Sequence, residues 1–159
     1  MRVCALSLGG NLGNRLENIR RAVGMMKPLG TVTKKSGVYE TPPWGVEAQP
    51  RFLNACLLLE TELAPEELLA RLKEIERNIG RVERERWGPR EIDIDILTCG
   101  GEVINGAKLT VPHPSMRERA FVLVPLRDIA PGLIVPPGDS VSSLLEKTDS
   151  DGIVRVTSL

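Results

Sequence analysis

The chain has 159 residues, a length that suits one domain with a substantial core, and we expect a single domain over residues 1–159. Its 21 Lys and Arg residues balance 21 Asp and Glu residues. This balance argues against a nucleic-acid partner, because nucleic-acid-binding proteins usually carry a basic excess. The sequence has no apolar run of about 18 residues and no signal-peptide pattern, so we expect a cytoplasmic protein with no membrane partner. The three cysteines lie in apolar runs and predict reduced core residues.

The first part of the chain predicts a strand, a helix and a second strand. Residues 2–8 are apolar and suit a buried strand, and a helix is expected from about 15 to 27. The glycine-rich residues 9–14 between them match neither GxxxxGK[ST] nor GxGxxG. They are therefore either a phosphate-binding loop or a tight structural turn. Residues 31–40 alternate and are rich in β-branched side chains, which predicts the second strand.

A long loop and a third strand follow. Residues 41–50 form a stiff, proline-rich connection, and connections of this length are often functional. Residues 51–62 predict a strand with Phe52, Asn54 and Cys56 on one face. A buried amide must be hydrogen-bonded. Asn54 is therefore either a ligand-binding residue or an amide that is bonded to a neighbouring loop.

The second helix is expected from about residue 64 to residue 79. Pro65 and two glutamates open it, as the missing proline N–H and the helix dipole favour. Gly80 ends it, and the charged residues 81–86 predict a loop. This loop leads directly into residues 86–97, which hold the most informative pattern in the chain.

Residues 92–97 alternate strictly, which predicts a half-buried strand. Its three isoleucines face a core, and Asp93 and Asp95 share the opposite face, roughly 6–7 Å apart. Two carboxylates at that spacing suit Mg²⁺, which completes its shell with water and phosphate oxygens. Arg86 and Arg90 suit phosphate binding. The alternative is a solvated strand face with surface charges beside a structural tryptophan, Trp87.

The last part of the chain predicts smaller elements. A hairpin is expected near residues 100–106, helical pieces at about 117–129 and 140–146, and a last strand at 152–157. The main elements then follow the order β-α-β-β-α-β. This order predicts an α+β, ferredoxin-like fold with an antiparallel sheet and an appended C-terminal segment.

Six ordered motifs resemble those of the 6-hydroxymethyl-7,8-dihydropterin pyrophosphokinase family of folate biosynthesis. They are Leu8 to Gly13, Glu40 to Gly45, Phe52 to Ala55, Ile75-Glu76 with Gly80-Arg81, Arg86 to Leu97, and Val111 to His113. The resemblance implies transfer of the pyrophosphoryl group of ATP to the pterin hydroxymethyl oxygen, with release of AMP. It also implies two Mg²⁺ ions, ATP and the pterin as substrates, and a monomeric chain.

The resemblance further implies a role for individual residues. Asp93 and Asp95 would bind the metal ions and act with Arg81 and Arg90 as the catalytic residues. The expected pterin-binding residues are Thr41, Pro42, Trp44, Phe52, Asn54, Trp87 and Phe121. The expected ATP-binding residues are Glu76, Arg81, Arg90, Ile96, Lys108, His113 and Arg119.

Three departures from the family pattern stand out. Gly10 replaces the usual serine, Pro114 follows the histidine where an aromatic residue can stand, and the loop 81–86 is about one residue shorter, which leaves Arg84 without an assigned role.

Two other classes share the element order or the scaffold. One is an RNA-binding module of the RRM type, whose third strand should carry a basic-Gly-aromatic-x-aromatic signature that residues 51–56 lack. The other is a non-catalytic nucleotide-binding regulator.

Overall fold

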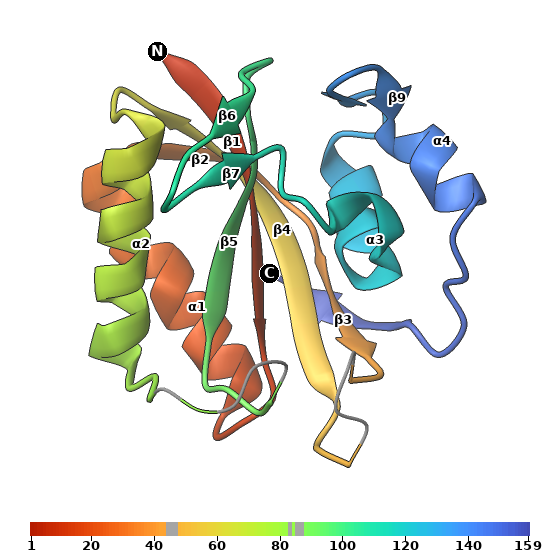
Figure 1. Cartoon of the computed structure of the whole chain (residues 1–159). Coiled ribbons are helices and arrows are strands. Elements are labelled where there is room, and N and C mark those ends of the chain that lie inside the picture. The colour runs from red at the N-terminus through yellow and green to blue at the C-terminus, as the bar shows by residue number, and fades with distance from the viewer. Residues whose placement is uncertain (44–47, 83, 85–87) are drawn as a thin grey trace.

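An antiparallel sheet with helices on both faces forms the framework of the protein (Figure 1). The computed structural model describes residues 1–43, 48–82, 84 and 88–159. The helices are α1 (Arg15–Met25), α2 (Pro65–Ile79), α3 (Ala120–Ile129) and α4 (Val141–Glu146), with 3-10 turns at Lys27–Leu29 and Met116–Glu118. The strands are β1 (Arg2–Gly10), β2 (Thr31–Lys35), β3 (Gly37–Thr41), β4 (Phe52–Thr61), β5 (Asp93–Cys99), β6 (Ile104–Asn105), β7 (Thr110–Val111), β8 (Ile134–Val135), β9 (Asp139–Ser140) and β10 (Val154–Ser158).

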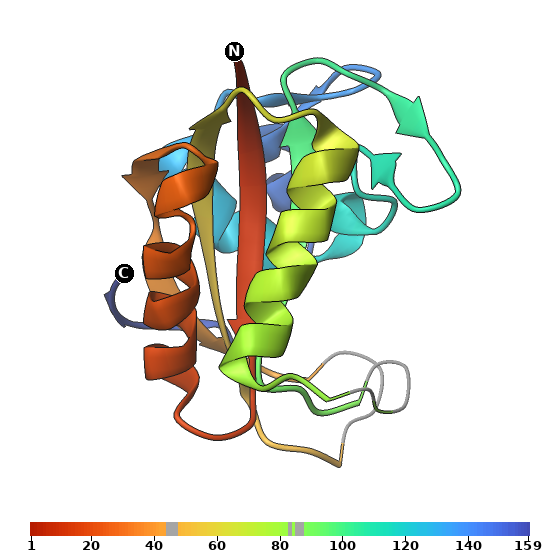
Figure 2. The same ribbon diagram turned by 90° about the vertical axis from the view of Figure 1, so that its left-hand side faces the viewer.

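The main sheet has the strand order β10-β3-β4-β1-β5, and β2 also pairs with β4. Helices α1 and α2 cover one face, and α3 and α4 lie on the other, as Figures 1 and 2 show from two sides. One buried apolar cluster lies under α1 and α2, and a second lies under α3 and α4. The predicted α+β, ferredoxin-like fold is confirmed.

The expected strand over residues 31–40 is interrupted at Ser36. Its backbone N–H donates to the Cys56 carbonyl (2.9 Å), and its hydroxyl accepts from the Cys56 N–H (2.8 Å). A serine side chain thereby replaces one backbone group of the ladder. The segment consequently divides into β2 and β3, which both pair with β4.

The end of α2 directs the chain toward β5. Gly80 adopts the left-handed conformation (φ 114°), and the next N–H, that of Arg81, donates to the carbonyl of Glu76 (3.1 Å). This is the pattern of a Schellman cap, which ends a helix and turns the chain away from its axis. Arg81 thus leaves the helix beside β5, where its guanidinium reaches Asp93.

The cysteine prediction is confirmed, because Cys4, Cys56 and Cys99 are all free and buried. Among the described residues, no helix combines the length and the apolar character that a membrane crossing requires.

Candidate active site

A pocket lies between the face of the sheet that carries α3 and the N-terminal end of that helix. Four strands contribute to it, and it encloses about 510 Å³ of space, part of which is open to solvent. The lining residues are Ser7, Gly9, Thr41, Pro42, Phe52, Asn54, Arg90, Asp93, Asp95, Arg119 and Phe121.

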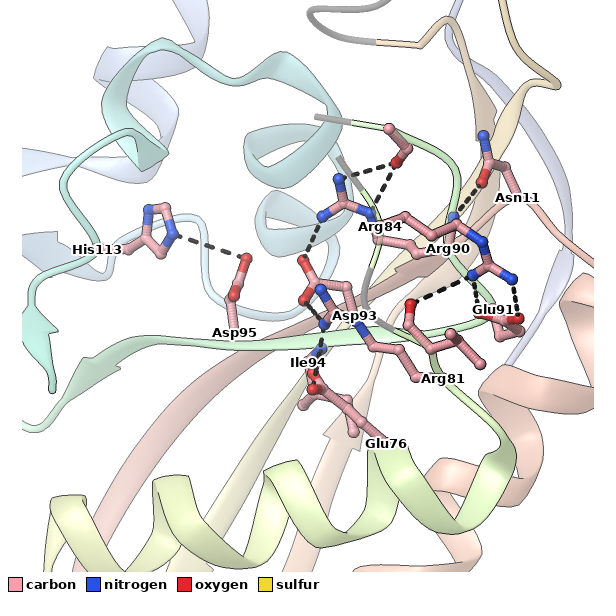
Figure 3. Close-up of polar contacts among 12 residues, drawn as sticks. Asn11, Glu76, Arg81, Arg84, Arg90, Glu91, Asp93, Ile94, Asp95 and His113 are labelled. Carbon is pink, nitrogen blue, oxygen red and sulfur yellow. Dashed lines mark hydrogen bonds and ion pairs between the residues drawn. The ribbon is translucent and has the colours of Figure 1, made fainter. Parts of the chain in front are cut away.

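Asp93 and Asp95 face this pocket from β5, while Ile94 and Ile96 point to the opposite, buried side. The predicted division of the strand into an acidic and an apolar face is thereby observed. Figure 3 shows Asp93 held between two arginines. Its Oδ1 accepts from Arg81 Nη1 (2.7 Å) and its Oδ2 from Arg90 Nη1 (3.2 Å).

The second aspartate lies in a less favourable environment for a negative charge. Burial and then the charge of Asp93 raise the pKa of Asp95 to about 7, although Arg119 and Arg90 oppose this shift. A raised carboxyl pKa means that the ionised form is costly without additional positive charge. A bound cation would therefore stabilise the ionised form of the acidic pair.

The donor set fits Mg²⁺. The described residues contain no group of three or more His, Cys, Asp and Glu side chains that could hold a metal ion by themselves. Two carboxylates beside a pocket, with the remaining ligands supplied by water and phosphate, form the usual protein contribution to a magnesium–nucleotide site. Asp93 and Asp95 are the residues that would hold the ion.

Glu76, on α2, is hydrogen-bonded to the backbone of β5. Its side chain is only 6% exposed, and its Oε2 accepts from the backbone N–H of Ile94 (2.7 Å). Its Oε1 accepts from Arg81 Nη1 (3.1 Å). Burial and then the charge of Asp93 raise the pKa of Glu76. The carboxylate therefore fixes β5 between its two aspartates and also positions Arg81.

His113 lies next to the acidic pair without forming a charged pair with it. Its Nε2 is 3.6 Å from Asp95 Oδ2, which is too long for a hydrogen bond. Burial and then the charge of Arg119 lower the pKa of His113 to about 4. Its Nδ1 accepts from the Ser115 N–H (3.1 Å), so the neutral ring carries its proton on Nε2. His113 is thus a neutral donor that faces the site.

The other part of the pocket is aromatic and amide-lined. Phe52 lies under the Arg90 guanidinium (5.9 Å from Cζ to the ring centroid), and Phe121 lies under Arg119 (5.4 Å). Asn54 is buried and donates through Nδ2 to the Thr41 hydroxyl (2.6 Å). The Asn54 amide lines the pocket and is bonded to a strand residue, Thr41, rather than to a neighbouring loop. Its ligand-binding role stays a prediction.

The first loop forms a tight turn against the segment before β5. The N–H groups of Asn11 and Leu12 both donate to the Arg90 carbonyl (3.0 and 3.2 Å), and Asn11 Oδ1 accepts from the Arg90 N–H (2.9 Å). A Cβ on Gly10 would lie 2.3 Å from the Glu91 carbonyl oxygen. These contacts support the structural-turn interpretation of residues 9–14, and they explain why a glycine fits at position 10.

Two lining residues, Ser7 and Gly9, were not predicted from the sequence. They enter the pocket because β1 pairs with β5, so that Ser7 lies opposite Asp95 and Gly9 lies opposite Asp93. A Cβ on Gly9 would lie 2.4 Å from Asn54 Oδ1. A glycine within a strand often marks such a close approach, but the expected strand ended at residue 8, so this signal did not apply to Gly9.

Several predicted residues lie outside the pocket lining. Glu76 is bonded to Ile94 and Arg81, the Ile96 side chain belongs to the opposite core, and Lys108 is exposed near β7. Their nucleotide contacts stay predictions. Arg84 pairs with Glu91 through two hydrogen bonds (2.7 and 2.9 Å). Trp44, Arg86 and Trp87 lie outside the described residues.

The fold and the pocket together define a class of protein. A carboxylate pair among arginines, beside a pocket lined by two phenylalanines and an amide, fits a metal- and nucleotide-dependent phosphotransferase. The model of the 7,8-dihydro-6-hydroxymethylpterin-pyrophosphokinase (HPPK) family matches residues 5–131. The chain belongs to this family, as the sequence motifs predicted.

Individual relatives agree with this assignment. The chain is 45% identical over 153 residues to the 2-amino-4-hydroxy-6-hydroxymethyldihydropteridine pyrophosphokinase of Methylorubrum extorquens, covering 95% of this chain and 96% of that protein. It is 46% identical over 131 residues to the enzyme of the same name from Aquifex aeolicus, covering 82% of each chain. It is also 50% identical over 125 residues to the mitochondrial folate synthesis bifunctional protein of Arabidopsis thaliana, covering 78% of this chain but 23% of that protein.

Solved structures show the same fold. Wild-type HPPK-DHPS of Plasmodium falciparum with pteroate superposes with a TM-score of 0.74 at 15% identity, covering 92% of this chain and 44% of that chain. An HPPK-DHPS in complex with substrates gives a TM-score of 0.73 at 14% identity, covering 92% and 45%. The chain thus spans less than half the length of these two structures.

Proposed function

We propose that this chain transfers the pyrophosphoryl group of ATP to the hydroxymethyl group of 6-hydroxymethyl-7,8-dihydropterin, giving the pterin diphosphate and AMP. The family to which it belongs is named for this activity. The observation that carries the proposal is one pocket in which an amide and two phenylalanines lie next to Asp93 and Asp95. On this proposal a ring-binding site and a metal–phosphate site adjoin, as the reaction requires.

The pterin is proposed to occupy the part of the pocket lined by Phe52, Phe121, Asn54, Thr41 and Pro42. Offset stacking of a flat ring on an aromatic side chain adds about 0.5–1.5 kcal/mol beyond the area that it buries. The Asn54 amide carries two N–H donors and an acceptor oxygen, and its bond to Thr41 uses one donor. The same bond fixes the orientation of the amide, so Asn54 is prepared to recognise a polar ring edge.

The triphosphate of ATP is proposed to lie beside Asp93 and Asp95. Two Mg²⁺ ions, when bound there, would supply charge neutralisation and Lewis-acid activation. Arg81 and Arg90 now donate to Asp93. Because guanidinium groups bind phosphate oxygens well, we expect both arginines to share their donors with the substrate. Arg119 is buried at the same pocket and would add a third positive charge.

His113 is proposed to contact phosphate as a donor rather than to act as a general base. The lowered pKa keeps its ring neutral near pH 7, and the Ser115 N–H fixes the proton on Nε2. A donor at that position can hydrogen-bond to an oxygen of the nucleotide. The predicted cytoplasmic location and monomeric state stay predictions.

Product analysis tests the proposal. The protein is incubated with Mg-ATP, with and without the hydroxymethyl dihydropterin, and the nucleotides are separated by chromatography. AMP should form only when the pterin is present, and Asp95→Asn should abolish it. ADP as the product would indicate an ordinary kinase, and binding of ATP without turnover would favour a nucleotide-binding regulator.

A further inference from the structure

The C-terminal segment lies beyond the part of the chain that the family model matches, residues 5–131, yet it contacts a residue that lines the pocket, Pro42. Its last strand, β10, pairs antiparallel with β3 and extends the main sheet (Figure 1). Val154 lies opposite Glu40 in this register. Extending the same register by two residues places Gly152 opposite Pro42, a residue of the pocket lining. The segment therefore meets the wall of the pocket from outside.

The contact between Gly152 and Pro42 is close. A Cβ on Gly152 would lie 3.1 Å from Pro42 Cγ, and the φ of Gly152 is 80°, a conformation that favours glycine. The turn before it is held by its own bonds, from the Asp151 N–H to Asp149 Oδ1 (2.9 Å) and from the Ile153 N–H to the Ser150 carbonyl (3.3 Å). Gly152 thus presents an ordered backbone to the outer side of Pro42.

An arginine joins this turn to the start of β4, the strand that pairs with β3. Arg51 Nη2 donates to the Gly152 carbonyl (2.6 Å), and Arg51 directly precedes Phe52. Arg51 Nε also lies 3.4 Å from Glu40 Oε1, and Arg15 donates both to Glu40 (3.0 Å) and to the Arg51 carbonyl (3.0 Å). These side chains are partly exposed, so each ion pair contributes little stability. Their effect is to set where the ends of β3 and β4 lie.

We infer that the turn of residues 149–152, with β10, is a positioning element for the pterin pocket. It fixes Pro42 and the start of β4 through Gly152 and Arg51 without touching the ligand. The inference rests on the proposed function, because it assigns the pterin to this part of the pocket. Without β10, the outer side of β3 would be a strand edge, and edges have no ladder to hold them in place. The element should therefore affect pterin binding and leave ATP binding unchanged.

Two matched pairs of variants test the inference by steady-state kinetics, with one substrate varied while the other saturates. Gly152→Ala places a methyl group against Pro42. Its control, Gly100→Ala, imposes a similar positive-φ strain (φ 58°) where a Cβ meets nothing within 4 Å. Arg51→Ala removes the bond to Gly152. Its control, Arg155→Ala, removes an arginine from β10 that donates to Ser158 (3.0 Å), away from the pocket.

The expected result is a split between kinetic constants. Gly152→Ala and Arg51→Ala should raise the KM for the pterin by about three- to tenfold, with kcat and the KM for ATP within about twofold of wild type. Both controls should keep all three constants within about twofold of wild type. If Gly152→Ala does not fold, the Arg51 and Arg155 pair decides the question alone.

Two results would overturn the inference. One is an unchanged pterin KM in Gly152→Ala and Arg51→Ala. The other is an equal rise in the controls, which would show that the segment acts only through general stability. Failure of the proposed function looks different, because the wild-type protein itself would then form no AMP with either substrate in excess.

Discussion

Replacing Glu76 with alanine should destabilise the protein by about 2–5 kcal/mol, and most of this loss should come from one backbone group. The Ile94 N–H is buried, and Glu76 Oε2 is its acceptor (2.7 Å). Leaving a buried N–H without an acceptor costs about 1–3 kcal/mol. Removing one buried methylene group, since alanine keeps Cβ, costs about 0.8 kcal/mol more. Loss of the pair with Arg81 adds about 0–1 kcal/mol, since Arg81 is 27% exposed and keeps its bond to Asp93.

Glutamine at position 76 separates the hydrogen bond from the charge. Glu76→Gln keeps an acceptor for Ile94 and fills the same space, so it should cost at most about 1 kcal/mol. The pKa of Glu76 is raised above 4.5 in the folded protein by burial and by Asp93. For an acid with a raised folded pKa, stability is highest below the unfolded pKa and falls as the pH rises through the folded value. The stability of Glu76→Gln relative to wild type should therefore improve as the pH rises above 4.5.

Urea denaturation without metal or nucleotide measures these differences. Glu67→Ala is the matched control, because Glu67 lies on the same helix, is 54% exposed and pairs only loosely with Arg71 (3.8 Å). It should change stability by no more than about 0.5 kcal/mol. Equal losses in Glu76→Ala and Glu76→Gln would show that the bond to Ile94 is not the source of the effect. A loss in Glu76→Ala no larger than that of Glu67→Ala would refute the structural role altogether.

Further predictions concern the two halves of the pocket. Asp93→Asn and Asp95→Asn should each lower turnover by several orders of magnitude with a native circular dichroism spectrum, because each removes a proposed metal ligand; near-normal rates in both would exclude the metal site. Asn54→Ala should weaken pterin binding by about 1–3 kcal/mol in titration calorimetry and leave the affinity for an ATP analogue unchanged; a parallel loss of both would contradict the pterin assignment. His113, the single histidine, should titrate by NMR with a midpoint near a pKa of about 4. Its neutral form is favoured by folding, so this contribution to stability should be lost as the pH falls from 6.5 through that value; a midpoint at 6.5 would refute its burial.

The sequence predicted those site residues whose position depends on local periodicity. Asp93 and Asp95 face the pocket because alternation along one strand determines which face each side chain occupies. The same rule placed Phe52 and Asn54 together. The roles of Phe121 and Arg119 were implied by the family resemblance, and both residues line the same pocket.

Features that depend on pairing between distant segments were not predictable. The entry of Ser7 and Gly9 into the pocket follows from the register of β1 with β5, which no local pattern specifies. The bond from Ile94 to Glu76 joins a strand to a helix that ends before it in the chain. Ser36 interrupts the predicted strand because its hydroxyl is placed against Cys56, 20 residues away. Each of these features depends on tertiary packing rather than on local propensity.

The fate of the β-phosphate of ATP tests the central claim most directly. ATP that carries a radiolabel only at the β-phosphate is incubated with Mg²⁺, the protein and the hydroxymethyl dihydropterin, and the products are separated. Transfer of the pyrophosphoryl group places the label on the pterin product and leaves unlabelled AMP. Label that remains in the nucleotide as ADP would show transfer of the γ-phosphate alone and would contradict the account.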